Sequence, residues 1–201
     1  MKLSEEMKNK TLLSFELFPP KTEKGLQNLP GTIDHLMKYN PSYISCTYGA
    51  GGGNVGANRE VCQMIKNAGT TPVTHFTVIK NTKEGIKEDQ YLVDGVDHML
   101  ALRGDIPLGE TTTCGDFDYA TDLVKFVRDT YGDKFEIAVA GSPEGHISCR
   151  SLESDIAVLK QKQDNGADYI MTQLCWDMEQ FERWLDKIRK AGVTLPVDVG
   201  I

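Results

Sequence analysis

A single carboxyl group stands in the middle of an apolar run near the start of the sequence. Glu16 lies within residues 12–18, which read LLSFELF, and Pro19 and Pro20 end the run. A charged group that is buried without a partner is costly, so a buried carboxyl is either paired or protonated. Glu16 is therefore either a structural carboxylate paired with a core arginine or lysine, or a neutral acid. Burial raises the pKa of a carboxyl group, which is what a general acid near neutral pH requires.

Further hydrogen-bonding and titratable side chains stand where other apolar runs end. They are Thr47, His75, Arg103 and Asp105, Ser142 with Glu144 and His146, and Gln173. Such groups could bind a polar ligand or move a proton. The simpler alternative is that strand ends lie near water, but this explains a solvated serine better than Glu16 between Phe15 and Leu17.

Seven short apolar runs predict the strands that would position these groups. They cover residues 12–18, 43–48, 72–79, 98–104, 136–142, 169–176 and 195–201. Helical patterns lie between them at residues 117–131, 151–166 and 177–191, and a less regular one at 83–95 is interrupted by Gly85. Asp177 and Gln180 form a capping-box pattern at the start of the last helix. Alternation of near-continuous apolar strands with helices predicts a parallel sheet covered by helices.

Two architectures fit this alternation, a doubly wound sheet and a (β/α)8 barrel. The first turn of a dinucleotide-binding sheet should read GxGxxG, but Pro19, Pro20 and Lys21 stand there. A barrel places its functional residues at the carboxyl ends of its strands, where the polar groups lie. We therefore predict an α/β fold of the (β/α)8 TIM-barrel type, in one domain over residues 1–201. Because seven strands leave a barrel open, we expect it to be truncated after about the seventh strand, or completed by a second copy or another chain.

Composition and charge exclude several classes of function. A net charge of −7 argues against a nucleic-acid-binding protein. No apolar run approaches the roughly 18 residues that cross a bilayer, and the charged first ten residues do not resemble a signal peptide. Residues 49–56, GAGGGNVG, are a weak phosphate-loop pattern whose glycines do not lead directly into a clear helix start, so we expect a flexible loop.

The cysteines indicate a reducing compartment. The five, none in a CxxC pair, are Cys46, Cys62, Cys114, Cys149 and Cys175. We expect reduced thiols in a cytoplasmic protein. Neither these cysteines nor the four histidines show the spacing of metal ligands, so no metal site is expected.

Five segments, taken in order, give the sequence a family resemblance. FELFPPK (15–21), YISCTYGAGG (43–52), THFT (74–77), ALRGD (101–105) and MTQ (171–173) resemble methylenetetrahydrofolate reductase. The resemblance runs from about residue 12 to residue 201. It implies a barrel that binds FAD, or FMN as in some relatives, and reduces 5,10-methylenetetrahydrofolate to 5-methyltetrahydrofolate with NADH or NADPH. It also implies a cytoplasmic enzyme of one-carbon metabolism and methionine biosynthesis.

The resemblance assigns roles to individual residues. Glu16 would protonate the departing folate nitrogen, Asp105 would lie near the pterin and tune the flavin, and Gln173 would hydrogen-bond folate or nicotinamide. The implied flavin contacts are Thr47, His75, Arg103, Gly104, Tyr119, His146, Asp155 and Lys162. Asp155 and Lys162 are seven residues apart, on one helical face, so both can reach one ligand.

The sequence departs from the family pattern in two places. Ser142 stands where a tyrosine is common, which removes an aromatic surface near the flavin, and LCW (174–176) replaces a more aromatic run. Two other functions stay open. One is a truncated, partner-dependent or non-catalytic relative that binds flavin or folate. The other is an unrelated barrel lyase or aldolase that uses Lys80 as a Schiff-base lysine.

Overall fold

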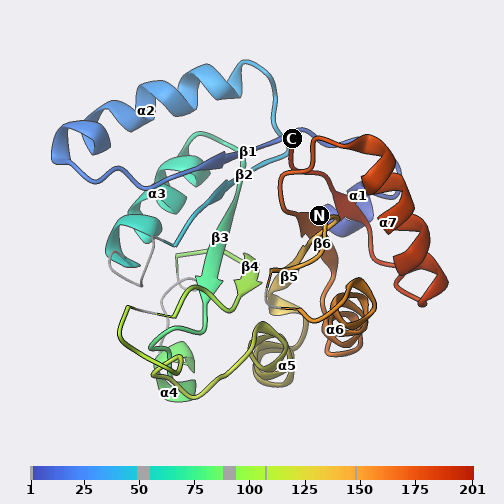
Figure 1. Ribbon diagram of the computed structural model, residues 1–201. Helices are drawn as coiled ribbons and strands as arrows, with labels where there is room; N and C mark the ends of the chain where they lie inside the picture. Colours follow the sequence, from blue (N-terminus) through green and yellow to red (C-terminus); the bar gives the residue numbers. More distant parts are fainter. Residues whose placement is uncertain (1, 49–54, 88–93, 107, 148) are drawn as a thin grey trace.

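Seven parallel strands form one curled sheet in the computed structural model, which describes residues 2–48, 55–87, 94–106, 108–147 and 149–201 (Figure 1). The strands are β1 (Ser14–Leu17), β2 (Tyr43–Cys46), β3 (Thr71–Thr77), β4 (His98–Leu102), β5 (Glu136–Gly141), β6 (Tyr169–Thr172) and β7 (Val197–Asp198). Each strand pairs in parallel with the next one along the chain, so the sheet order is β1 to β7. All seven predicted strands are confirmed.

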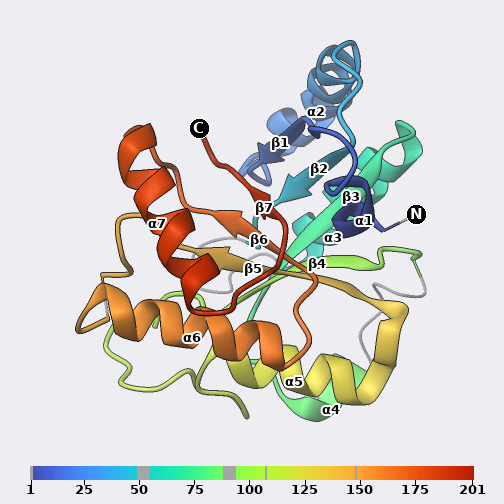
Figure 2. The same ribbon diagram turned by 90° about the vertical axis from the view of Figure 1, so that its right-hand side faces the viewer.

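Helices return the chain along the outside of the sheet, as Figures 1 and 2 show. They are α2 (Glu23–Met37), α3 (Val55–Asn67), α4 (Lys83–Lys87), α5 (Ala120–Tyr131), α6 (Leu152–Asp164) and α7 (Met178–Lys190), and the short α1 (Leu3–Glu6) precedes β1. The predicted helices at 117–131, 151–166 and 177–191 correspond to α5, α6 and α7. At the start of α7, Asp177 Oδ1 accepts a hydrogen bond from the backbone N–H of Gln180 at 3.0 Å, as the capping pattern predicts.

Two helix predictions need correction. The pattern at 83–95 forms a helix only as far as Lys87 in the described part of the chain, and residues 88–93 lie outside it. The loop at 49–56 does lead into a helix, because α3 begins at Val55, while residues 49–54 lie outside the described part. Helices α1, α2 and α3 were not predicted.

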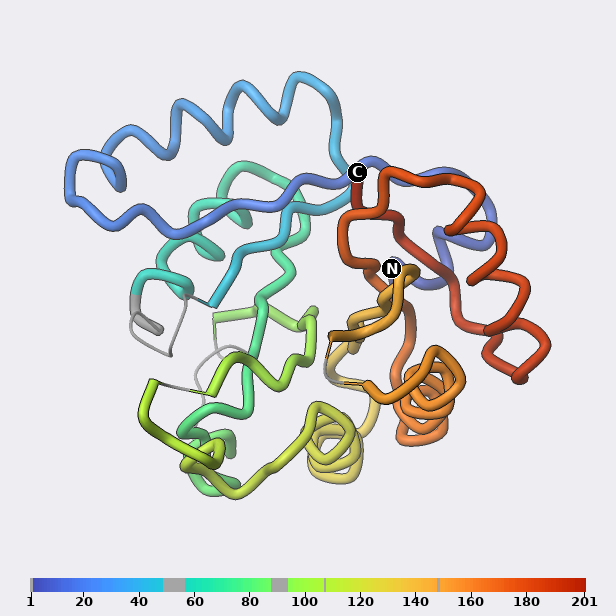
Figure 3. Tube along the Cα trace, in the orientation of Figure 1, coloured from blue at the N-terminus to red at the C-terminus, as the bar shows by residue number. Residues whose placement is uncertain are grey.

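The strand order decides between the two architectures. A doubly wound sheet reverses its order at a switch point and carries helices on both faces. Here the order never reverses, the long helices lie outside, and the sheet curls into a half-barrel (Figure 3). The chain therefore has an α/β fold of the TIM-barrel type, as predicted.

Strand side chains alternate between an outer and an inner core because successive residues point to opposite faces. The outer core packs the sheet against the helices and includes Ile44, Phe76, Val139, Ile170 and Trp184. The inner core is a smaller cluster of Leu3, Tyr43, Val73, Leu100, Ala138 and Tyr169. In the part of the chain that is described, no helix is both long enough and apolar enough to cross a membrane.

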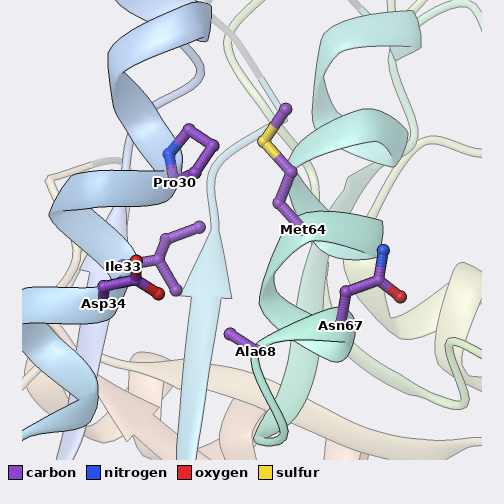
Figure 4. Close-up of a pocket in the computed structure, with 6 residues that line it drawn as sticks. All are labelled: Pro30, Ile33, Asp34, Met64, Asn67 and Ala68. Atoms are coloured by element: carbon purple, nitrogen blue, oxygen red, sulfur yellow. The ribbon is translucent and has the colours of Figure 1, made fainter.

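A groove between α2 and α3 lies on the outer layer (Figure 4). Its lining residues are Pro30, Ile33, Asp34, Met64, Asn67 and Ala68. Asn67 and Ala68 come just before β3 begins, so the groove lies toward the amino ends of the strands, opposite the end where the candidate functional residues lie.

Helix α1 closes the amino-terminal end of the curled sheet. Leu3 is only 1% exposed and belongs to the inner core. The backbone N–H groups of Leu3 and Ser4 donate to the Glu136 carboxylate at 2.7 and 2.8 Å. Nε2 of His98 lies 2.9 Å from the same carboxylate, and Nδ1 lies 2.7 Å from Asp97. This cluster ties the first residues of the chain to the starts of β4 and β5.

The two titratable groups of this cluster predict a window of maximum stability. Burial alone would lower the pKa of His98, but the contacts with Asp97 and Glu136 outweigh it and raise the pKa from 6.5 to about 9. Burial likewise opposes ionisation of Glu136, but His98, Ser4 and Leu3 lower its pKa from 4.5 to about 2. The His98 contribution is complete below pH 6.5 and is lost as the pH rises toward 9. The Glu136 contribution is complete above pH 4.5 and is lost as the pH falls toward 2.

We therefore expect the free energy of unfolding to fall between about pH 6.5 and pH 9, and His98→Gln to remove this slope. Denaturant unfolding at a series of pH values measures it. His35→Gln, at an exposed position on α2, is the matched control and should keep the slope. An unchanged slope in His98→Gln would show that another group causes it.

Candidate functional site

Three polar side chains meet on the inner face of the sheet, near the carboxyl ends of β1, β2 and β3. Glu16 is paired in register with Ser45 on β2, and His75 lies near the end of β3. Nε2 of His75 is 3.4 Å from Oε2 of Glu16, within ion-pair distance but not aligned as a hydrogen bond. The structure thus brings together two of the residues that the sequence singled out.

The prediction that Glu16 is buried with a raised pKa is wrong. Its side chain is 45% exposed, and proximity to His75 lowers its pKa, outweighing the opposite effect of partial burial. The reason is strand alternation, because Phe15 and Leu17 point outward against the helices while Glu16 points inward. The apolar neighbours in the sequence therefore do not cover the carboxylate.

Buried polar atoms beside this pair have no hydrogen-bond partner among the described residues. They are Ser45 Oγ and Thr77 Oγ1, together with His75 Nε2. Buried polar groups are nearly always satisfied by protein, water or ligand, so these atoms mark a place where a polar ligand or water would bind. Ser45 and Thr77 were not predicted, although each stands two residues from a predicted one, Thr47 or His75, and so shares its face.

The turn after β4 carries Arg103, Gly104 and Asp105. Gly104 has φ of +80°, and a Cβ there would come within 2.9 Å of Thr77 and Ile79 side-chain atoms, so only glycine fits. Nε of Arg103 donates to the carbonyl oxygen of Gly104 at 3.4 Å, and Asp105 is exposed. The backbone conformation of Gly104 therefore fixes where Arg103 and Asp105 leave the strand.

Asp155 and Lys162 come together on α6, as their spacing predicts. The Asp155 carboxylate accepts from the backbone N–H of His146 at 3.2 Å and from Sγ of Cys149 at 3.5 Å. Lys162 Nζ donates to the carbonyl oxygen of Ala140 at 2.9 Å. Burial lowers the pKa of Lys162, against the attraction of Asp155. This cluster places one cation and one carboxylate beside the carboxyl end of β5.

The remaining predicted residues occupy the same end of the sheet. Thr47 directly follows β2 and is half-buried, and Gln173 follows β6 with its backbone N–H donating to Gly141 at 2.8 Å. Tyr119 precedes α5 and is 61% exposed. His146 is exposed on the loop after β5. Because parallel strands end at one edge of the sheet, Thr47 and Gln173 lie at that edge.

Three other expectations concern the cysteines, a metal site and Lys80. All five cysteines are free, as predicted, and Cys46, Cys62 and Cys175 are buried. Within the described ranges, no group of three or more His, Cys, Asp or Glu side chains could hold a metal ion. Lys80 is exposed beyond the end of β3, which does not support a buried Schiff-base lysine.

Comparison with known families gives a match over nearly the whole chain. The family described as "Methylenetetrahydrofolate reductase" matches residues 2–201. A protein of Oryza sativa subsp. japonica named "Probable methylenetetrahydrofolate reductase (NADH)" is 37% identical over 207 residues, covering 96% of this chain and 35% of its own. "5,10-methylenetetrahydrofolate reductase" of Escherichia coli (strain K12) is 34% identical over 199 residues, covering 98% of this chain and 66% of its own. The chain thus spans about a third of the plant relative and about two thirds of the bacterial one.

Solved structures share the fold at much lower identity. One is an uncharacterized protein from Clostridium thermocellum, whose description says that it binds two copies of 5-methyl-5,6,7,8-tetrahydrofolic acid. It matches with a TM-score of 0.67 at 15% identity, over 96% of this chain and 66% of its own. A 2,3-dimethylmalate lyase matches with a TM-score of 0.62 at 13% identity, over 97% of this chain and 68% of its own. At these identities the likeness is one of fold.

Proposed function

Because the chain belongs to the methylenetetrahydrofolate reductase family, we propose that it carries the site where 5,10-methylenetetrahydrofolate is reduced to 5-methyltetrahydrofolate, with a flavin and a reduced nicotinamide. The single observation that supports this most directly is the Glu16–His75 pair, 3.4 Å apart on the inner face at the mouth of the barrel. It offers a carboxyl group to a ligand at the end of the strands where barrel enzymes bind their substrates.

A flavin fits the residues that are present. Its ring edge needs hydrogen-bond partners, and Ser45 Oγ and Thr77 Oγ1 are buried polar atoms without one in the described structure. Its phosphate and ribose need a cation and acceptors, which Lys162, Asp155 and Arg103 would supply. We infer FAD, with FMN as the alternative. When bound, the flavin would take up hydride from NADH or NADPH and deliver it to the folate carbon.

Glu16 would move the proton of this reaction. Opening the five-membered ring of the folate requires a proton on the departing nitrogen. The half-exposed carboxylate can be reached from the mouth, and His75 keeps its pKa low while it is open to water. A pterin ring that covers Glu16 would remove water from it, which raises the pKa of the carboxyl group and favours uptake of the proton to be delivered. Exposure of the free carboxylate is thus compatible with the proposed acid.

Asp105 and Gln173 would act on the same substrate. The open ring leaves a positively charged carbon–nitrogen double bond, and a carboxylate nearby stabilises that charge. Asp105 is exposed at the turn fixed by Gly104, so it is free to face a ligand in the mouth. Gln173 would supply the amide that orients folate or nicotinamide.

The visible spectrum of the purified chain tests the proposal. We expect flavin absorption that NADH or NADPH bleaches and that methylenetetrahydrofolate restores, with menadione as an artificial acceptor for comparison. Restoration by menadione but not by folate would favour a flavin-binding relative without folate reductase activity. A colourless chain that does not take up added FAD or FMN would contradict the proposal.

We also propose a cellular location and an association with another chain. Five free cysteines suit a reducing compartment, which supports a cytoplasmic location. In the described sheet β1 and β7 each pair on one side only, which supports association with a second copy or with another chain.

A further inference from the structure

A polar cluster crosses the inside of the barrel and joins its first strands to its last. The Asp198 carboxylate on β7 accepts hydrogen bonds from the Tyr43 hydroxyl on β2 and from Ser14 Oγ on β1, the latter at 3.3 Å. These partners are 155 and 184 residues away along the chain. Figures 1 and 2 show the end of the chain curling back toward β1.

The donors of this cluster stay protonated at neutral pH. Burial, with Asp198 adding to it, raises the pKa of Tyr43 far above its ordinary value. Tyr43 is fully buried, so its ring is held by the inner core while its hydroxyl reaches Asp198. A hydrogen bond to a charged acceptor in such surroundings is among the stronger ones in proteins.

Strand β1 depends on this cluster more than strands β2 to β6 would, because each of those is paired on both sides. In the described sheet it has a strand neighbour on one side only, β2, through four register pairs. Ser14 stands two residues before Glu16 and shares its inward face. The contacts that hold Ser14 in place therefore also fix the position of Glu16 along the strand and the direction of its side chain.

We propose that Asp198 is a positioning residue, which holds β1 against β2 through Ser14 and Tyr43 and so keeps the Glu16 carboxylate beside His75. The consequence for catalysis rests on the proposed function of Glu16, but the positional claim does not. The positional claim can be tested by measuring the pKa of Glu16 in the chain without any ligand.

Several charged or titratable groups face Glu16 and set the expected direction of change. His75 faces it from β3, and on β2 the Glu16 charge raises the pKa of Tyr43 on the inner face and of Cys46 on the outer face. Asp198 faces the same interior from β7. Loss of the cluster would loosen the contact with His75, so the pKa of Glu16 would rise.

The test measures the pKa of Glu16 by carboxyl-carbon NMR, and hydrogen exchange at the amides of β1, in the ligand-free chain. Tyr43→Phe removes the stronger donor without changing any charge. We expect the pKa of Glu16 to rise, because its contact with His75 loosens, and the β1 amides to exchange faster. Ser14→Ala is the milder variant, and we expect it to change the Glu16 pKa and the β1 exchange in the same directions.

Two substitutions of Asp198 separate its charge from its hydrogen bonds. Asp198→Asn keeps an acceptor oxygen and should not raise the pKa of Glu16, whereas Asp198→Ala should speed exchange in β1. Asp186→Asn, on the exposed face of α7, is the charge-matched control and should change neither.

The outcomes separate the alternatives. If Tyr43→Phe and Asp198→Ala only lower the melting temperature, with the Glu16 pKa and β1 exchange unchanged, the cluster is merely structural and the proposal is overturned. If both readouts move as expected while the unaltered chain fails to reduce folate, the positioning role stands and the proposed function fails.

Discussion

Replacing Glu16 by glutamine is expected to abolish folate reduction while oxidation of the reduced nicotinamide continues. Glutamine has nearly the same shape but cannot donate a carboxyl proton, and general acid catalysis contributes about 10²–10⁴-fold to a rate. Transfer of hydride from the nicotinamide needs no such proton, so that half of the reaction should change little. Stopped-flow absorbance of the bound flavin follows both halves separately.

A matched control makes this result specific. Glu182→Gln makes the same chemical change at an exposed position on α7 and should leave both halves unchanged. Equal loss of both halves in Glu16→Gln, with normal folding, would mean that Glu16 supports the site rather than donating a proton. The carboxylate is half-exposed, so the substitution should have little effect on stability.

The largest loss of stability is expected from Arg128→Ala. The guanidinium, on α5, donates to the carbonyl oxygen of Gly166 at 2.6 and 3.0 Å and to Asp168 at 2.6 Å. It also reaches the carbonyl oxygens of Gly132 and Phe135 at 2.7 and 3.3 Å. Its side chain is only 18% exposed. The Arg128 side chain therefore donates hydrogen bonds to carbonyl groups in the turns that precede both β5 and β6.

Removing this side chain leaves several carbonyl groups without their partner, whereas the Asp168 carboxylate keeps a contact with Lys2 Nζ at 3.5 Å. Breaking a buried pair costs about 3–5 kcal/mol, and we expect about 3 kcal/mol here because Asp168 keeps the Ile137 N–H at 2.8 Å. Denaturant unfolding measures the loss. Arg183→Ala on α7, whose pairing with Glu179 is exposed, should cost less than about 1 kcal/mol. Equal losses in the two variants would contradict the role of Arg128.

The fold was predictable because its signals are local and repeated. Each strand lies within a short, mainly apolar run, and a helix pattern separates most of these runs. Helix α2 was missed because Pro30 lies inside it and Gly25 and Gly31 interrupt its pattern, although Thr22 caps its start by accepting from the Gly25 N–H at 3.1 Å. Helix α1 was missed because its four residues are held by tertiary contacts rather than by local preference.

The sequence predicted that Glu16 and His75 lie at the same end of the sheet, but it did not predict the exposure and the pKa of Glu16. The positions of strand ends in the sequence indicated that Glu16 and His75 lie near one another, and the two side chains do meet at 3.4 Å. Burial of Glu16 could not be read from Phe15 and Leu17, because neighbours along a strand face the other side of the sheet. Likewise, no local pattern pairs Ser14 and Tyr43 with Asp198, since that cluster depends on how far the sheet curls.

The docking of α1 has a consequence for synthesis on the ribosome. Leu3 and Ser4 leave the ribosome well before the carboxylate that receives their N–H groups, which is 133 and 132 residues later. The inner core therefore stays unfinished until β5 and β6 have emerged, because Ala138 and Tyr169 belong to it, while β1, β2 and β3 can already pair. Contacts so distant in sequence slow folding, and Leu3 would remain available to chaperones during that delay.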